Sequence, residues 1–588
     1  MKKTRITAIA ATAAFALSLS ACGGGSSSDD GDGGGNNSTP KFNAGVDNVY
    51  NPSDTKGGTL KMANDADWDS LDPGDTYYGY SWNFIRNYTR SLVTFKSAPG
   101  AKSNELVPDL AESLGEPSSD AKTWTYKLRE GIKYEDGTPV KSVDVKYAIA
   151  RSLDKDVLVN GPTYFNDFLD LKGYAGPFKD KDLTMKKFTA IETPDDRTLI
   201  FHLSKPFSGF DYLTMLPSTA PVPPAKDTGT KYKEHVVSTG PYKFESNELG
   251  KQFVLTRNDQ YDPATDPDTG RKALPDRIEV ALNVNQADID QRLQSGALDV
   301  AVSGLGVQAE TRAKILNDPQ LKQFSDTAEQ ARTWFTSFDN SVKPFDNIHC
   351  RKAVMYAVDK EGYLRAYGGG SGGKIATNMM PPLVPGFKKI DLYEAESKPT
   401  GDIEKAKQEL EECGQPDGFS TNISYRAERD AEKATAEALQ QSLDKIGIKT
   451  ELKAYPQGDY GKLYAGKKDF STKTKLGLRV YGWGADWNDG FGFLGQIVDS
   501  RVIRDAGNTN FNVNDPEVDA LLDKALATLD DKEREGMWSQ IDQKVMEGAY
   551  YLPGVWAKQL LYRPERLTNV FISDAYNMYD YTTMGVQK

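Results

Sequence analysis

The segment Tyr481–Leu494, with the sequence YGWGADWNDGFGFL, places two carboxylates among aromatic side chains. A lone carboxylate is costly to bury, so each acid needs a partner. Asp486 lies between Trp483 and Trp487. In a dry cleft its carboxylate can pair with an ammonium group, and aromatic faces add cation–π attraction and apolar walls. These residue types suit a site for a cationic ligand group. The residues alone nevertheless favour the alternative, in which Asp486 caps a turn or helix while Trp483 belongs to the core, because Asp caps are common.

Two neighbours in the same segment have other expected roles. Asp489 precedes GFGFLGQIVD, which is predicted to begin a short helix, so Asp489 is expected to be its N-cap. Tyr481 stands at the end of a predicted strand, either in the core or on the wall of a cleft. The sequence does not indicate catalysis, because it has no phosphate-binding loop and no zinc spacing. No metal and no cofactor is therefore expected.

The chain that carries this segment is large and acidic. Its 588 residues exceed one compact domain and allow two or three lobes with sizeable cores. The formal net charge of -12 argues against nucleic acid as a partner.

Helices and strands alternate most regularly in the second half, which predicts an α/β lobe with a largely parallel sheet. Helices are predicted there over 350–368, 402–414, 431–447 and 515–529, and strands over 333–340, 449–455 and 475–483. In the first half, strands are predicted over 59–63, 123–129, 198–203, 242–246, 253–257, 277–284 and 299–303, and helices over 142–154 and 286–296.

The N-terminus has the pattern of an export signal. The positive stretch MKKTR precedes the apolar run Ile6–Leu19, which is too short to span a membrane. The ending LSAC resembles the bacterial lipobox, which implies a signal peptide over 1–21 and acylation of Cys22. The alternative is a plain secretory signal with a chance cysteine. Residues 22–56 begin with a Gly-, Ser- and Asp-rich stretch and are expected to form a disordered tether.

Two cysteines remain after Cys22. An exported chain enters an oxidising space, so Cys350 and Cys413 are expected to form a disulfide. The alternative is two separate buried thiols. A catalytic thiol is disfavoured, because the three histidines are scattered along the chain.

The order of motifs resembles that of the extracytoplasmic solute-binding proteins of ABC importers, in the family with oligopeptide- and dipeptide-binding members (family 5). The matching blocks, in chain order, are GGTLKMANDADWDSLDP, LVPDLAESL with WTYKLREGIKYEDGTPVKSVDVKYAIARSLD, STGPYKFES with FVLTRNDQY, KPFDNIHCRKAVMYAVDK, IGIKTEL and YGWGADWND.

This resemblance implies an α/β, two-lobed Venus-flytrap fold of the periplasmic-binding-protein type (class II), with an extra subdomain on the first lobe. Lobe I is expected to take residues 57–93, 221–331 and 553–588, the extra subdomain 94–220, and lobe II 332–552. Segments that cross between the lobes are expected to act as hinges.

The resemblance also implies a ligand site. In peptide-binding members the Asp of the WGAD segment binds the peptide amine, and that role falls on Asp486. The loop DPGDTYYGYSW lies where relatives contact the ligand backbone, which makes Asp75, Thr76, Tyr77 and Tyr78 candidates; an ordinary Tyr-rich surface loop is the alternative. The loop 372–387 carries only Lys374 where some dipeptide binders have an Arg, which favours longer or different ligands.

The function that follows is binding and not catalysis. A monomer, lipid-anchored on the outer face of the cell membrane, is expected to deliver peptides to an ABC permease with separate ATPase subunits. An oligosaccharide or another small solute is the alternative ligand, and an extracellular hydrolase is a third reading.

Overall fold

A computed structural model describes residues 40–427, 429–456, 459–511 and 513–587. These residues all belong to one unit of the chain, which spans Asn37–Lys588. The predicted signal peptide over 1–21 and the lipidation candidate Cys22 lie outside the described residues.

Lobe I is built on a five-stranded sheet with the strand order β11-β1-β10-β9-β8. β1 is parallel to β10 and β11, whereas β9 is antiparallel to both of its neighbours. Alternate residues of β10 are buried, as a strand with one covered face requires. The strands are β1 (Thr59–Ala63), β8 (Tyr242–Glu248), β9 (Gln252–Arg257), β10 (Arg277–Ala281) and β11 (Val300–Ala301), and the helices of this lobe are α1 (Gly79–Ile85), α6 (Gln286–Gln294), α7 (Ala309–Asn317) and α8 (Pro319–Lys322).

Both ends of the described chain pack on lobe I. The C-terminal residues form two small sheets, in which β18 (Leu567–Thr568) pairs with β21 (Gly585–Val586) and β19 (Ile572–Ser573) pairs with β20 (Met578–Tyr579). Residues 40–56 also pack there, so the prediction of a tether over 22–56 is wrong for its last part. The Asn43 amide donates to the Ser325 carbonyl at 3.0 Å, and the buried Tyr50 forms a bridge with Val570. The backbone amide of Asn43 and the buried ring of Tyr50 anchor these residues to lobe I.

The extra subdomain has a four-stranded sheet with the order β4-β5-β7-β6. Its position on lobe I is fixed by Arg151, which is fully buried and pairs with Asp72 at 2.7 Å and with Asp227 at 3.0 Å. Asp72 belongs to the loop that follows β1, so the subdomain holds that loop in place. The elements are β4 (Glu116–Pro117), β5 (Thr123–Lys127), β6 (Ile191–Glu192), β7 (Thr198–His202), α2 (Ser142–Ser152), α3 (Tyr164–Phe168), α4 (Pro177–Asp180) and α5 (Phe210–Thr214), next to the hairpin of β2 (Val93–Phe95) and β3 (Leu106–Pro108).

Lobe II contains a six-stranded sheet with the order β13-β17-β12-β16-β14-β15. The strands are β12 (Ser325–Phe338), β13 (Gly373–Ile375), β14 (Ser420–Arg426), β15 (Lys449–Tyr455), β16 (Leu478–Gly484) and β17 (Tyr551–Tyr562). The helices are α9 (Ile348–Ala357), α10 (Lys360–Ala366), α11 (Ile403–Glu412), α12 (Asp430–Asp444), α13 (Tyr460–Leu463), α14 (Lys468–Lys473), α15 (Gly490–Val498), α16 (Pro516–Ala527) and α17 (Asp531–Glu547).

The prediction of a largely parallel sheet in lobe II is wrong. β14 is parallel to β15 and β16, as a strand–helix–strand unit around α12 requires. β12, however, is antiparallel to both β16 and β17, and β13 is antiparallel to β17. The sheet is mixed because β12 brings the chain into the lobe and β17 takes it out again alongside.

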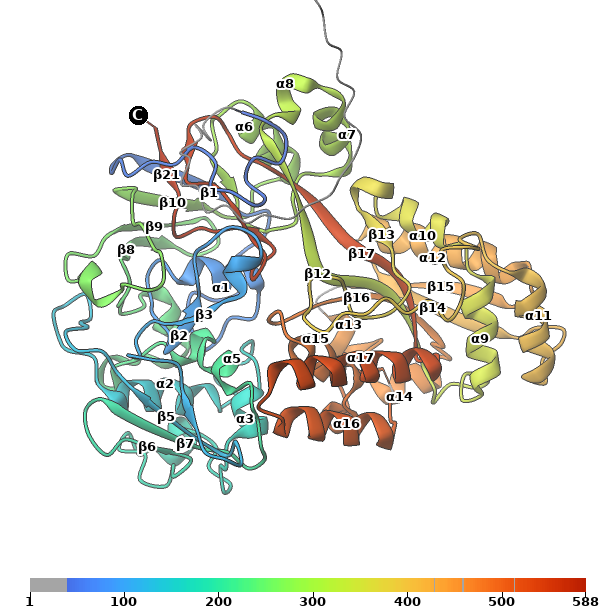
Figure 1. Ribbon diagram of the computed structural model, residues 1–588, viewed down its shortest axis with the longest axis horizontal. Helices are drawn as coiled ribbons and strands as arrows, with labels where there is room; N and C mark the ends of the chain where they lie inside the picture. Colours follow the sequence, from blue (N-terminus) through green and yellow to red (C-terminus); the bar gives the residue numbers. More distant parts are fainter. Residues whose placement is uncertain (1–39, 428, 457–458, 512, 588) are drawn as a thin grey trace, which may run out of the picture. The chain divides into compact units, whose positions relative to one another are not determined.

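β12 and β17 connect the two lobes, and Figure 1 shows them as the longest strands, one green and one red. They pair from Ser325 opposite Tyr562 to Ser337 opposite Tyr551, with a register shift between Glu329 and Thr333. The predicted lobe boundaries, at 331/332 and 552/553, fall inside these two strands. Such a register shift leaves residues without a cross-strand partner.

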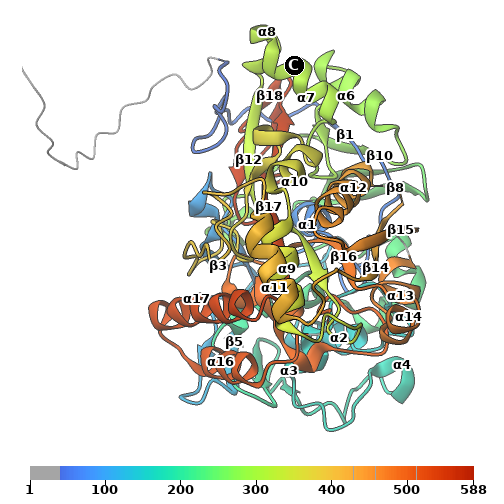
Figure 2. The same cartoon turned by 90° about the vertical axis from the view of Figure 1, so that its right-hand side faces the viewer.

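A disulfide joins Cys350 of α9 to Cys413, directly after α11, with a Cα–Cα distance of 5.2 Å. The two helices lie side by side in Figures 1 and 2. Among the residues that the structure describes, none of the helices has the length and apolar composition needed to cross a membrane.

Candidate functional site

The segment that follows β16 enters α15 through Asp489. Its side chain accepts a hydrogen bond from the Phe491 amide at 2.8 Å, which makes Asp489 the N-cap of α15 (Gly490–Val498). The predicted helix and its cap are confirmed. Burial raises the pKa of the Asp489 carboxyl group, and the positive charge of the nearby Arg534 opposes this shift. Asp489 is thus committed to the fold.

Asp486 caps no helix and instead meets two tyrosines. Its Oδ2 accepts a hydrogen bond from the Tyr77 hydroxyl at 2.8 Å and a second one from the Tyr164 hydroxyl. Burial raises the pKa of Asp486 to about 6, against the opposing effects of these two hydrogen bonds and of the Arg332 charge. Oδ1 has no hydrogen-bond partner among the described residues, so one carboxylate oxygen is available to a further donor.

The Asp486 contact joins three parts of the chain. Tyr77 lies in the loop between β1 and α1 of lobe I, Tyr164 begins α3 of the extra subdomain, and Asp486 belongs to lobe II. Trp487 supports the same junction, because its fully buried ring stacks on Tyr212 at 5.8 Å and contacts Tyr164 at 4.9 Å between centroids. In this conformation the two lobes therefore touch through the carboxylate that sequence patterns single out.

The other candidate residues fall into two groups. Thr76 and Trp487 are fully buried, and Thr76 donates to Asp69 at 2.8 Å, so neither presents a surface to a ligand. Asp75 is also largely engaged, since it accepts from the Asn160 amide at 2.9 Å. Tyr77 reaches Asp486 directly, and Tyr78 is 51% exposed.

Trp483 and Tyr481 are partly buried, so their exposure lies between that of the fully buried Trp487 and that of the exposed Tyr78. The Trp483 indole donates to the Phe493 carbonyl at 2.8 Å, and the Tyr481 ring stacks on Tyr460 with an interplanar angle of 5°. Both stay candidates for the ligand wall because neither side chain is fully buried.

Three arginines near this junction have no counterpart in the sequence predictions. Arg332 of β12 and Arg429 before α12 both lie over the Trp334 ring, with Cζ 5.3 and 6.0 Å from its centroid. Arg426, at the end of β14, lies 4.8 Å from the Tyr481 ring and pairs with the buried Glu432. Burial and the neighbouring charges of Arg429 and Arg426 lower the pKa of Arg332 to about 10.

Arg332 lacks a polar partner. Within the part of the chain that the structure describes, its guanidinium makes no hydrogen bond and no ion pair, and it faces Gly484 across the β12–β16 pair. A guanidinium presents five donors in a planar fork that matches carboxylate oxygens. The cluster of Arg332, Arg426 and Arg429 therefore offers positive charge to an anionic group. Lys374, by contrast, is paired with Glu329 at 3.1 Å.

An open groove of about 630 Å³ lies elsewhere, between α6 and the α7–α8 region of lobe I. Its lining is mostly polar, and none of the predicted ligand residues contributes to it. It carries no aromatic wall and is a separate surface feature.

Comparison with known proteins agrees with this arrangement of two lobes. Residues 105–504 match the model of the bacterial extracellular solute-binding proteins, family 5. The match covers more than half of the chain, which belongs to this family of solute-binding proteins.

Individual relatives extend the match over nearly the whole chain. The solved structure of the clavulanic acid biosynthesis oligopeptide binding protein 2 is 37% identical, with a TM-score of 0.90, over 93% of this chain and 99% of that one. The oligopeptide-binding protein OppA of Bacillus subtilis is 26% identical over 92% of this chain and 93% of its own length. Heme-binding protein A of Haemophilus influenzae is 28% identical over 79% of this chain and 80% of its own length.

Proposed function

We propose that this protein captures peptides with a free amino terminus between its two lobes and delivers them to an ABC permease driven by separate ATPase subunits. It works as a monomer outside the cytoplasm, held by a lipid on Cys22, and catalyses no reaction. Two of the relatives named above are oligopeptide-binding proteins, which supports this ligand class. Partitioning of the full chain into detergent, compared for wild type and Cys22→Ser, tests the anchor.

The observation that carries the proposal is the Asp486 carboxylate where three parts of the chain meet. Its Oδ2 accepts from two tyrosine hydroxyls and its Oδ1 has no donor among the described residues. An ammonium group brings up to three N–H donors and a full positive charge, which suits a partly buried carboxylate better than a neutral donor does. A ligand amine at Oδ1 would leave the tyrosine contacts, and hence the closed junction, in place.

Arg332 supplies a second charged group beside the proposed site, close enough for its charge to act on the Asp486 carboxylate. A peptide that places its amine at Asp486 carries its carboxylate elsewhere, and the unpaired Arg332 guanidinium is a suitable partner in a partly buried position.

Arg332→Gln is expected to lower the affinity for a peptide acid by about tenfold, which corresponds to about 1.4 kcal/mol for one charge-assisted hydrogen bond. The same peptide with an amidated C-terminus is the control and should bind wild type and variant alike. Titration calorimetry measures both, and equal losses for acid and amide would rule out a carboxylate at Arg332.

Peptide affinity should depend on pH through Asp486. Its pKa is raised to about 6 from an ordinary value of 3.8, so the ligand-free fold favours the protonated acid. The contribution of protonated Asp486 to the free energy of unfolding is therefore present at low pH, and it is lost as the pH rises through about 6. An ammonium ligand needs the ionised form, so its affinity should be level above about pH 7 and fall by up to tenfold per pH unit below about 6.

Titration calorimetry between pH 5 and pH 8 measures this profile. The Asp486→Asn variant is the control, because it cannot titrate at this position and its profile should be flat near pH 6. A wild-type affinity that is constant down to pH 5 would contradict amine binding at Asp486.

Aromatic side chains near Asp486 also suit a sugar, whose apolar faces pack on rings, so an oligosaccharide is the second candidate ligand. A thermal-shift panel separates the two. We expect stabilisation by free peptides, weaker stabilisation by N-acetylated peptides and none by oligosaccharides. Stronger stabilisation by oligosaccharides than by free peptides would instead favour a sugar as the ligand. Breakdown of a bound peptide would indicate a hydrolase.

A further inference from the structure

We propose that lobe II carries a second site, for a divalent transition-metal ion such as Zn²⁺, formed by His349, Glu409 and Glu412. The proposal does not depend on the peptide site, with which it shares no residue. Sequence spacing did not indicate this site, because the histidine and the glutamates belong to different helices.

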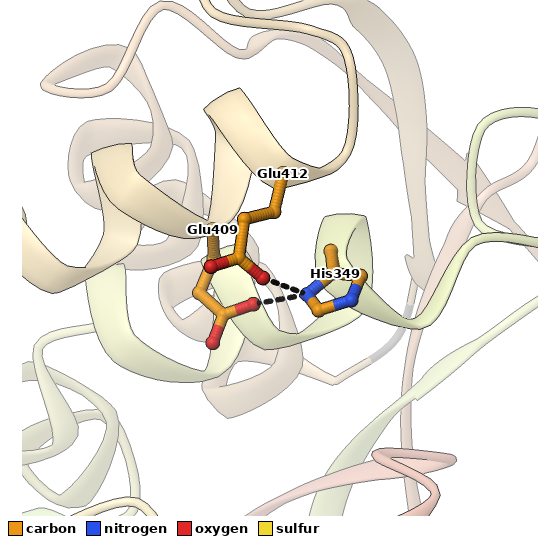
Figure 3. Close-up of side chains that lie close together, drawn as sticks. All are labelled: His349, Glu409 and Glu412. Carbon is orange, nitrogen blue, oxygen red and sulfur yellow. Dashed lines mark hydrogen bonds and ion pairs between the residues drawn. The ribbon is translucent and has the colours of Figure 1, made fainter.

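The three side chains converge on one point. His349 is the second residue of α9, and the two glutamates lie three positions apart on α11, on one face of that helix. His349 Nδ1 is 2.7 Å from Glu409 Oε2 and 3.0 Å from Glu412 Oε2. Figure 3 shows the imidazole pointing between the two carboxylates, and one ligand atom from each residue lies within 4.8 Å of the others.

The local charges are not balanced without a cation. Nδ1 carries at most one proton, directed at one acceptor, yet two carboxylates approach it. Neither glutamate has a Lys or Arg partner within 4.0 Å among the described residues. Two like charges at this helical spacing repel each other. A divalent ion in place of the shared proton would bind neutral imidazole and neutralise both carboxylates.

The donor set suits such an ion. One imidazole nitrogen and two carboxylate oxygens are ligands that Zn²⁺ accepts, with water completing a tetrahedral site. Zn²⁺ binds these ligands at about 2.0–2.2 Å, which places the ligand atoms roughly 3.3 Å apart. The side chains need to open by only a few tenths of an ångström, which the 63% exposed Glu412 side chain allows.

The covalent frame holds the ligands in register. The disulfide residues directly follow two of them, because Cys350 follows His349 and Cys413 follows Glu412. Asn347 caps α9 by accepting from the His349 amide at 2.9 Å, which fixes the backbone of that ligand. Little reorganisation then opposes binding, since the two helices are joined at the site itself.

Titration calorimetry of ZnCl₂ into the chelator-treated, tag-free full chain tests the proposal. We expect one ion per chain and a thermal midpoint that rises with free Zn²⁺. His349→Gln and Glu412→Gln should each weaken Zn²⁺ binding at least tenfold, and X-ray absorption should report nitrogen and oxygen ligands without sulfur.

His235→Gln is the matched control, because His235 pairs with only one glutamate, Glu135, at 2.7 Å. This substitution should leave the number of Zn²⁺ ions bound per chain unchanged. Binding that survives His349→Gln, or a wild type that takes up no Zn²⁺, would overturn the proposal.

Discussion

Asp486→Asn should lower the affinity for a peptide with a free amino terminus by about 10- to 100-fold, because it removes a charge-assisted hydrogen bond worth about 1.5–3 kcal/mol. The amide oxygen can still accept from Tyr77 and Tyr164, so the junction between the lobes keeps its hydrogen bonds. The loss therefore reports the ligand charge and not the closure of the lobes. Titration calorimetry with one peptide of defined sequence measures it.

The N-acetylated form of the same peptide is the control for this prediction. Acetylation removes the ammonium group, so wild type and Asp486→Asn should bind it with similar affinity, and the two changes should not add. Additive losses would place the amine at another partner. Unchanged affinity of the variant for the free peptide would refute the role of Asp486 outright.

Removal of the Cys350–Cys413 disulfide should lower the free energy of unfolding of lobe II by about 4 kcal/mol. The two cysteines are 63 residues apart in sequence, and opening a loop of that size raises the entropy of the unfolded chain by roughly this amount. Cys350→Ala combined with Cys413→Ser is the variant, and differential scanning calorimetry is the measurement. A chain of this size can unfold in more than one step, so the transition that shifts should be the one assigned to lobe II.

Wild type kept under a reducing agent is the matched control for the disulfide, since it opens the same loop without a substitution. Its transition should move with that of the double variant. Equal stability of the double variant and oxidised wild type would contradict the prediction. It would show that the packing of α9 on α11 already supplies the constraint attributed to the disulfide.

Short elements with strong local signals were predictable from sequence. The strand over 449–455 is β15, and the helix after Asp402 is α11, with Asp402 as its N-cap. The helix predicted over 431–447 corresponds to α12, and its residues Ala436, Leu439 and Leu443, which lie on one helical face, are buried. In each case the residues that determine the element lie within it, so the hydrophobic period and the cap were sufficient.

Elements set by long-range pairing were not predictable in the same way. β12 begins at Ser325, well before the predicted strand over 333–340, because its first half is held by β17 and not by an apolar pattern of its own. The helix predicted over 350–368 is divided into α9 and α10, with Asp359 capping the second. The antiparallel pairing of β12 with β17 is also an exception to the rule that helix–strand alternation gives a parallel sheet.

The candidate site divides in a similar way. The different roles of Asp486 and Asp489 follow from local sequence together with the family pattern, and the cap at Asp489 is confirmed. Tyr164 and Arg332 could not be found, because each is remote in sequence and reaches the junction only through the packing of the subdomain or the register of β12. The sequence contains no short motif around either residue that marks it as a ligand contact.

The most direct test of peptide capture is native mass spectrometry of the full chain incubated with an equimolar library of short peptides. The proposed function predicts a 1:1 adduct with an intact peptide at pH 7.5, and a weaker adduct at pH 5 or when the library is N-acetylated. A chain that retains no peptide from the free library, or retains the acetylated library equally well, would contradict it.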